Sequence, residues 1–181
     1  ESGQKRRNDR LLKGAEYLGK QVKSEVLPLV VDIAKQRTLS RQQVAALEFL
    51  QIDAAGTAIK SLDSLAKINE LDHLGGGLEL IPALLLTLAV SDYEKVEYTI
   101  EHAHTSVGYY AALAALGFVS EEIVVEGFRR GLDIPGHVSW LPGGTQLNGG
   151  RLGVMIPVAV GQALGKKAKY GKESWVVCHC G

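Results

Sequence analysis

Three histidine-containing segments in the middle of the chain carry the residue types best suited to chemistry. They are residues 72–77, 101–106 and 135–137, and each places histidine close to glycine or other small residues. Histidine donates hydrogen bonds to substrate oxygens and titrates near neutral pH, while glycine lets backbone N–H groups approach a ligand closely. A second glycine-rich stretch, residues 149–153, leads into an apolar run. Because these segments precede expected helices, the pattern predicts a site for a phosphorylated ligand.

Each histidine also has a structural interpretation. A single histidine beside glycine more often belongs to a turn or a cap than to a binding site, and the glycines at 75–77 are also consistent with a helix end. The order and combination of the segments favour His73 and His104 as site residues. His102 either faces away from His104 or acts as a second site residue beside it. His179, among apolar strand residues, is expected to be structural.

Composition indicates one globular domain without a global charge that would attract nucleic acid or a membrane. The 181 residues are 46% hydrophobic and 22% charged, and 20 basic residues balance 20 acidic ones. The longest apolar run, residues 81–90, is too short to span a bilayer, and no signal-peptide pattern opens the chain. Cys178 and Cys180 are the only cysteines, and we interpret them as reduced, buried strand residues. A cytoplasmic protein with no nucleic-acid partner and no membrane partner is expected.

The elements that must position these residues begin with helices. Apolar spacing predicts helices over the first seventy residues, and Ser40 is the expected N-cap of one that carries Val44, Leu47 and Leu50 on one face. A further helix is expected over residues 52–71. The glycines at 75–77 should then interrupt the pattern, before a fully buried helix over residues 78–90.

The second half of the sequence alternates between expected strands and helices. A short strand lies within residues 93–100, and a tightly packed, small-residue helix covers 107–116. The remaining expected elements are a helix that starts at Ser120, a loop over 131–150, a helix over 152–164, and a strand over 174–180 in the centre of a sheet. This order predicts an α/β domain whose sheet is incomplete.

In this order, the motifs resemble the N-terminal diphosphate-binding domain of transketolase and related thiamine diphosphate enzymes, over roughly residues 47–181. His73 and the glycines after it are similar to the family's Gly-His-Pro-Gly-Gly segment, and His104 is similar to the histidine of its Lys-Gly-His-Ala segment. His137 is similar to a later Gly-His-Pro turn, and residues 149–153 to a Thr-Gly-Ser-Leu-Gly-Gln-Gly stretch. Gly181 stands where a Gly-Asp-Gly metal motif starts.

The resemblance implies a fold, cofactors and site residues. The fold is the thiamin-diphosphate-binding fold, a doubly wound, mostly parallel α/β sheet with helices on both faces, incomplete at the C-terminus, and residues 1–46 form a helical N-terminal extension outside it. The cofactors are thiamine diphosphate and Mg²⁺ or Ca²⁺, with the metal ligands expected beyond Gly181. The implied catalytic residues are His73 and His104, and the implied cofactor-binding residues are His137, Gly150, Leu152 and Gly181.

The resemblance also implies an activity and partners. A two-carbon or acyl unit would pass from a ketose or 2-oxo acid donor to an aldehyde acceptor. A pyrimidine-binding domain or subunit would complete the enzyme as a homodimer or heterotetramer, and this chain alone should be inactive. Helix faces after Gly77 and around residues 111–115 are expected contact surfaces. Departures from the family, such as Asp72, Leu74 and the segment 101–103, suggest an altered substrate pocket. The alternative is a non-catalytic scaffold or regulatory subunit of the same fold.

Overall fold

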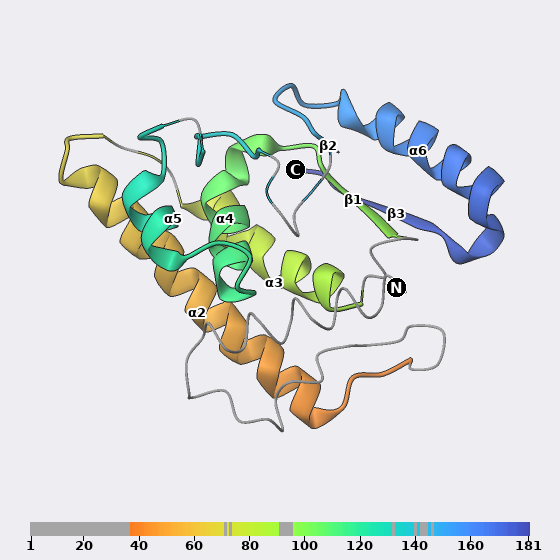
Figure 1. The fold of residues 1–181 in the computed structure, drawn as a ribbon, viewed down its shortest axis with the longest axis horizontal. Helices are drawn as coiled ribbons and strands as arrows, with labels where there is room; N and C mark the ends of the chain where they lie inside the picture. The colour runs from red at the N-terminus through yellow and green to blue at the C-terminus, as the bar shows by residue number, and fades with distance from the viewer. Residues whose placement is uncertain are drawn as a thin grey trace.

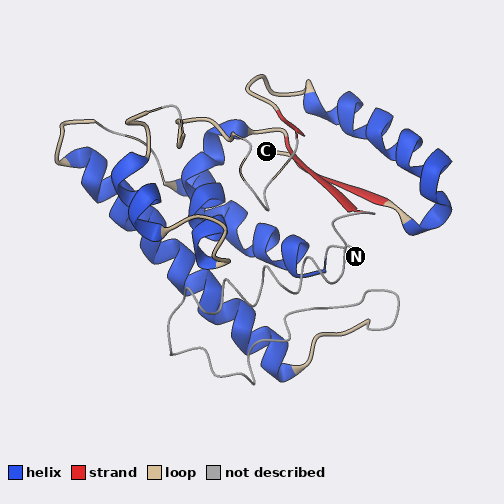
Figure 2. Ribbon diagram, viewed as in Figure 1, coloured by secondary structure: helices blue, strands red, loops and turns tan. Residues whose placement is uncertain are grey.

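The computed structural model describes residues 37–70, 72, 74–90, 96–131, 133–139, 141, 145 and 147–181. Figure 1 colours them along the chain and Figure 2 by secondary structure. The expected helices before residue 37 and the side chain of His73 lie outside the described residues, and the division at residue 46 stays a prediction. The elements in chain order are α2 (Arg41–Ala66), α3 (Gly75–Val90), β1 (Val96–Ile100), η2 (Ala103–Thr105), α4 (Ser106–Ala115), α5 (Glu121–Gly127), β2 (Leu147–Asn148), α6 (Met155–Tyr170), η3 (Gly171–Glu173) and β3 (Trp175–His179).

The described strands form a small, open, all-parallel sheet in the order β2-β1-β3. Helix α6 packs on β1 and β3, whereas α2 to α5 lie on the other side of the sheet (Figure 1). This α/β architecture fits an incomplete thiamin-diphosphate-binding fold. Within the described sheet β1 is central and β3 lies at an edge, so the expectation of a central β3 is wrong here. Trp175 of β3 is accordingly 54% exposed, whereas Ile100 of β1 is fully buried.

A single helix, α2, replaces the two helices expected between residues 41 and 71. Its N-cap is Ser40 as predicted, since the Ser40 hydroxyl accepts from the Gln43 N–H and the Gln43 side chain accepts from the Ser40 N–H. No proline occurs between residues 41 and 71, so nothing in the sequence breaks the helix near residue 50. Its buried stripe runs through small residues such as Ala54 and Ala58, which leaves Val44 on the exposed side.

Helices α3 and α4 cross in direct backbone contact at Gly77 and Gly108. A Cβ added to Gly108 would lie 1.8 Å from the Gly77 carbonyl oxygen. The glycines at 75–77 form the first turn of α3 instead of interrupting the helical pattern, and Gly77 is the one that this close approach requires. The expected tight packing of α4 is confirmed, since all ten of its residues are buried. That burial excludes residues 111–115 as a contact surface between subunits, and α3 is not fully buried, since Leu86 is 43% exposed.

Two further expectations about the second half need correction. The loop expected over residues 131–150 contains the two-residue strand β2, which pairs with Thr99 and Ile100. The last long helix begins at Met155 instead of residue 152 and extends to Tyr170. None of the described helices combines the length and the apolar character needed to cross a bilayer.

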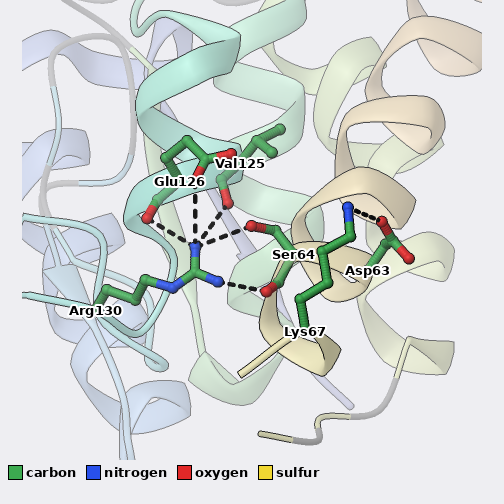
Figure 3. A network of polar contacts seen from close by, with 6 residues as sticks. All are labelled: Asp63, Ser64, Lys67, Val125, Glu126 and Arg130. Atoms are coloured by element: carbon green, nitrogen blue, oxygen red, sulfur yellow. Dashed lines mark hydrogen bonds and ion pairs between the residues drawn. The ribbon is translucent and has the colours of Figure 1, made fainter. Parts of the chain in front are cut away.

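Arg130 connects the end of α5 to the end of α2, as Figure 3 shows. Its guanidinium donates to the Ser64 hydroxyl at 3.0 Å, to the Ser64 carbonyl, and to the Glu126 carbonyl at 2.9 Å. The Glu126 carboxylate lies 3.8 Å away. Because the planar guanidinium has several donors in fixed directions, one side chain satisfies carbonyl groups at the ends of two helices.

Candidate functional site

The carboxyl ends of β1 and β3 and the first turn of α3 enclose a cleft of about 280 Å³. Ligands of open parallel sheets bind beyond the carboxyl ends of the strands. At the same edge of the sheet, the chain leaves β1 toward α4 on one face. It leaves the neighbouring strand β2 toward α6 on the opposite face, so the two connecting loops diverge. The lining residues are Gly76, Glu79, Leu80, His102, His104, Thr105, His179, Cys180 and Gly181.

Two residues predicted from the sequence, His104 and Gly181, line this cleft together. His104 lies in η2, directly after β1, and its side chain is exposed. Gly181 follows β3, which pairs in parallel with β1, so the two chain segments end at the same edge. A Cβ on Gly181 would lie 2.9 Å from Cγ of His102. Glycine is therefore required at this position because an imidazole ring packs against it.

Three other predicted site residues do not line the cleft. His137 is exposed on a turn whose backbone is fixed by α4, since the hydroxyl of Tyr110 donates to the His137 carbonyl at 2.7 Å. Gly150 and Leu152 are exposed in the turn that precedes α6, and Leu152 is 63% exposed. Their roles in cofactor binding stay predictions, as does that of His73.

His102 is the residue that the sequence left undecided, and the structure places it beside His104. The two rings form an edge-to-face pair with centroids 5.9 Å apart, and both line the cleft. Nδ1 of His102 lies 3.1 Å from the His179 carbonyl oxygen. The sequence could not show this contact because it depends on the register of β1 against β3.

His179, expected to be structural, also lines the cleft. Its ring packs edge-to-face on Tyr98 at 5.1 Å, and its Nε2 is buried without a hydrogen-bond partner among the described residues. The pKa of His179 is lowered from its ordinary value, because burial disfavours the charged ring and the nearby His102 opposes a second positive charge. The only sequence signal for this role was its position two residues before Gly181.

Glu101 connects this edge of the sheet to the glycine-rich turn before α6. The side chain is only 2% exposed, and its carboxylate accepts a hydrogen bond from the Gly153 N–H. Its own N–H donates to the His179 carbonyl at 2.8 Å. Gly149 packs closely against Glu101 and α6, because a Cβ there would lie 3.0 Å from the Glu101 carbonyl oxygen and 2.6 Å from Met155 Cγ. Glu101 therefore positions the segment that carries Gly150 and Leu152.

Replacement of Glu101 by alanine should lower the free energy of unfolding by about 2 kcal/mol, because a buried hydrogen bond to a charged acceptor is lost. Glu101→Gln keeps a side-chain acceptor and should lose less than half as much. Urea unfolding followed by circular dichroism measures both variants. Equal stability of Glu101→Ala and the wild type would show that the contact with Gly153 does not hold this turn.

The cysteines and the acidic residues do not form a metal centre in the described part of the chain. Cys178 and Cys180 are free thiols with sulfur atoms 3.9 Å apart. Cys180 is exposed beyond the end of β3, so the expectation of a buried strand residue is wrong for it. No group of three or more histidine, cysteine, aspartate or glutamate side chains is suitably arranged among the described residues.

Comparison with known proteins gives one informative similarity. One of the subunits of an apulose-4-phosphate transketolase, from Actinobacillus succinogenes (strain 130Z), is 35% identical over 81 residues, which cover 44% of this chain and 29% of the relative. The chain resembles part of a transketolase subunit. It spans less than a third of that relative's length in the match. No family model matches the chain, and no solved structure matches it.

Proposed function

We propose that the chain is the diphosphate-binding component of a transketolase-like, thiamine diphosphate-dependent transferase. The transferred group would be a two-carbon or acyl unit, from a ketose or 2-oxo acid donor to an aldehyde acceptor. The observation that carries this proposal is the cleft at the carboxyl edge of a parallel sheet, which His104 and Gly181 both line. The partial similarity to a transketolase subunit supports the same assignment.

The donor set of the cleft fits the anionic end of such a cofactor. Three imidazole rings line it, and α3 begins there, so the positive end of its dipole faces the cleft. The buried Nε2 of His179 also needs a polar partner, which a bound ligand would supply. In this proposal the N–H of Gly181 and the ring of His102 contact the diphosphate, and Mg²⁺ or Ca²⁺ accompanies it with ligands outside the described residues.

When bound, thiamine diphosphate supplies the carbanion stabilisation on which breaking of the donor's carbon–carbon bond depends. The residues of this chain bind and orient the cofactor and the substrate, and they transfer protons. His104, exposed at the cleft, donates a proton to the alkoxide oxygen that develops on the substrate carbonyl. Glu101 holds the turn with Gly150 and Leu152 in place. His73 and His137 are further proposed contacts of substrate and cofactor.

A pyrimidine-binding subunit or domain is the proposed partner, in a homodimer or a heterotetramer. The relative is named as one subunit of its transketolase, which supports the presence of a second. A row of exposed apolar side chains on α6 supports a surface that a partner covers. Ile156 is 46%, Val160 55% and Leu164 64% exposed, and they follow one another at four-residue intervals. They lie on the same side of the helix, away from the buried Met155 and Ala159.

The test is titration calorimetry of the complete protein, assembled with its partner, with thiamine diphosphate and Mg²⁺. We expect metal-dependent binding, and His104→Ala should weaken substrate turnover by about 100-fold or more through loss of a proton donor. Lys172→Ala is a control at an exposed position in η3 that does not line the cleft, and it should leave turnover unchanged. A folded, assembled complex that binds no thiamine diphosphate would overturn the proposal and favour the scaffold alternative.

A further inference from the structure

The tautomer of the neutral His102 ring is determined by its contact with β3. A carbonyl oxygen only accepts hydrogen bonds, so Nδ1 of His102, 3.1 Å from the His179 oxygen, must carry the hydrogen. The neutral ring therefore has its lone pair on Nε2. In that form Nε2 accepts a hydrogen bond and repels an anion, whereas a second proton turns it into a donor.

His102 is also held rigidly. Its carbonyl accepts from the Thr105 N–H at 3.2 Å and from the Thr105 hydroxyl at 2.9 Å. Its ring lies against Gly181 and meets the ring of His104 edge-to-face. The backbone is held at the carbonyl and the ring is held by the His179 carbonyl, Gly181 and His104, so this side chain loses little conformational freedom when it binds a ligand.

The charged and titratable groups around His102 come from three sides of the cleft. Glu79 on α3 and His104 on η2 line it with His102, and His179 and Cys180 belong to the β3 side. Glu101 is adjacent in sequence, but its carboxylate already accepts the Gly153 N–H. Glu79 is therefore the one acidic side chain among the described cleft-lining residues, against three imidazoles.

We propose that His102 binds an anionic oxygen of the ligand through Nε2 and takes up a proton as it does so. The identity of the anion as a diphosphate rests on the proposed function, but the coupling to a proton does not. Because Nδ1–H is committed to the His179 carbonyl, only the imidazolium donates a hydrogen bond at Nε2. Anion affinity consequently falls as pH rises, by up to about tenfold per pH unit for one linked proton.

The discriminating variant is His102→Asn. The asparagine amide nitrogen can replace Nδ1 as a donor to the His179 carbonyl, but asparagine has no group at the position of Nε2. A merely structural histidine should thus be replaced with little effect on binding. If His102 binds the anion, affinity should fall by about ten- to hundredfold, the effect of one hydrogen bond to a charged group. Thermal unfolding of the variant verifies that the fold is retained.

The experiment is calorimetry of the complete protein with sodium sulfate, which does not titrate near neutrality, and with inorganic pyrophosphate. Titrations at pH 6, 7 and 8 in buffers of different ionisation enthalpy measure the protons taken up. We expect proton uptake by the wild type that is larger than that of His102→Asn. His104→Ala is measured in parallel to separate the contribution of the second imidazole.

Two results would overturn the inference: equal proton uptake by wild type and His102→Asn, or equal anion affinity of the two. Binding of thiamine diphosphate by both proteins without any difference would leave the proposed function intact while removing this role of His102. Anion binding with the expected proton uptake, but no binding of thiamine diphosphate by the assembled complex, would support His102 and overturn the proposed function.

Discussion

Gly108→Ala should lower the free energy of unfolding by about 3 kcal/mol, at the upper end of what overpacking costs. The added methyl group would lie 1.8 Å from the carbonyl oxygen of Gly77 and 2.9 Å from the Cα of Gly77. Both are backbone atoms that no rotamer change can move. Helices α3 and α4 must therefore separate. Urea unfolding of the complete protein measures the effect. Because the first turn of α3 lines the cleft, anion binding should weaken as well.

Gly56→Ala is the matched control for this substitution. Gly56 lies inside α2, and a Cβ there meets no atom within 4 Å. Alanine should increase stability by about 0.5 to 1 kcal/mol, since glycine is a poor residue in a helix interior. Similar stabilities of the two alanine variants would contradict the close crossing of α3 and α4.

Arg130→Ala should lower the free energy of unfolding by about 2 to 3 kcal/mol, because the hydrogen bonds of a charged donor to partly buried acceptors are lost. The guanidinium joins Ser64 of α2 to Glu126 of α5 (Figure 3), and its side chain is 24% exposed. Arg130→Lys should recover little of the loss, because one ammonium group cannot reach both helix ends in the planar arrangement of arginine. Chemical unfolding at neutral pH measures both variants.

The ion pair between Lys60 and Glu121 provides the control, since it joins the same two parts of the fold. Its atoms are 2.6 Å apart, but the two side chains are 64% and 37% exposed. Lys60→Ala should cost less than about 1 kcal/mol, as is usual for exposed pairs. If Arg130→Ala cost no more than Lys60→Ala, the network in Figure 3 would contribute nothing beyond surface attraction.

Local patterns sufficed to predict several elements. The serine N-caps of α2 and α5 are confirmed, and so are β1 and the small-residue helix α4, because capping and apolar spacing are local properties. The strand β2 was missed because two residues are too few for any periodicity. The start of α3 was misjudged because glycine normally weakens a helix, whereas contact with Gly108 decides here.

The cleft was predictable only in part. Histidine and glycine motifs pointed to His104 and Gly181, and both line it. The positions of His102 and His179 at the cleft were not predictable, because they depend on the parallel pairing of Ile100 with His179 across the sheet. The contact between the His179 carbonyl of β3 and the His102 ring, which follows β1, cannot be predicted from the spacing of residues along the chain.

The same pairing has a kinetic consequence. Contacts among α2, α3 and α4 join segments that are closer in sequence than β1 and β3, whose first pair joins Val96 to Trp175. Non-local pairs form slowly because a long loop must close first. During synthesis His102 and His104 leave the ribosome well before His179 and Gly181 exist. We therefore expect the helical layer to assemble first and the cleft to form later, so that anion binding reports the pairing of β1 with β3.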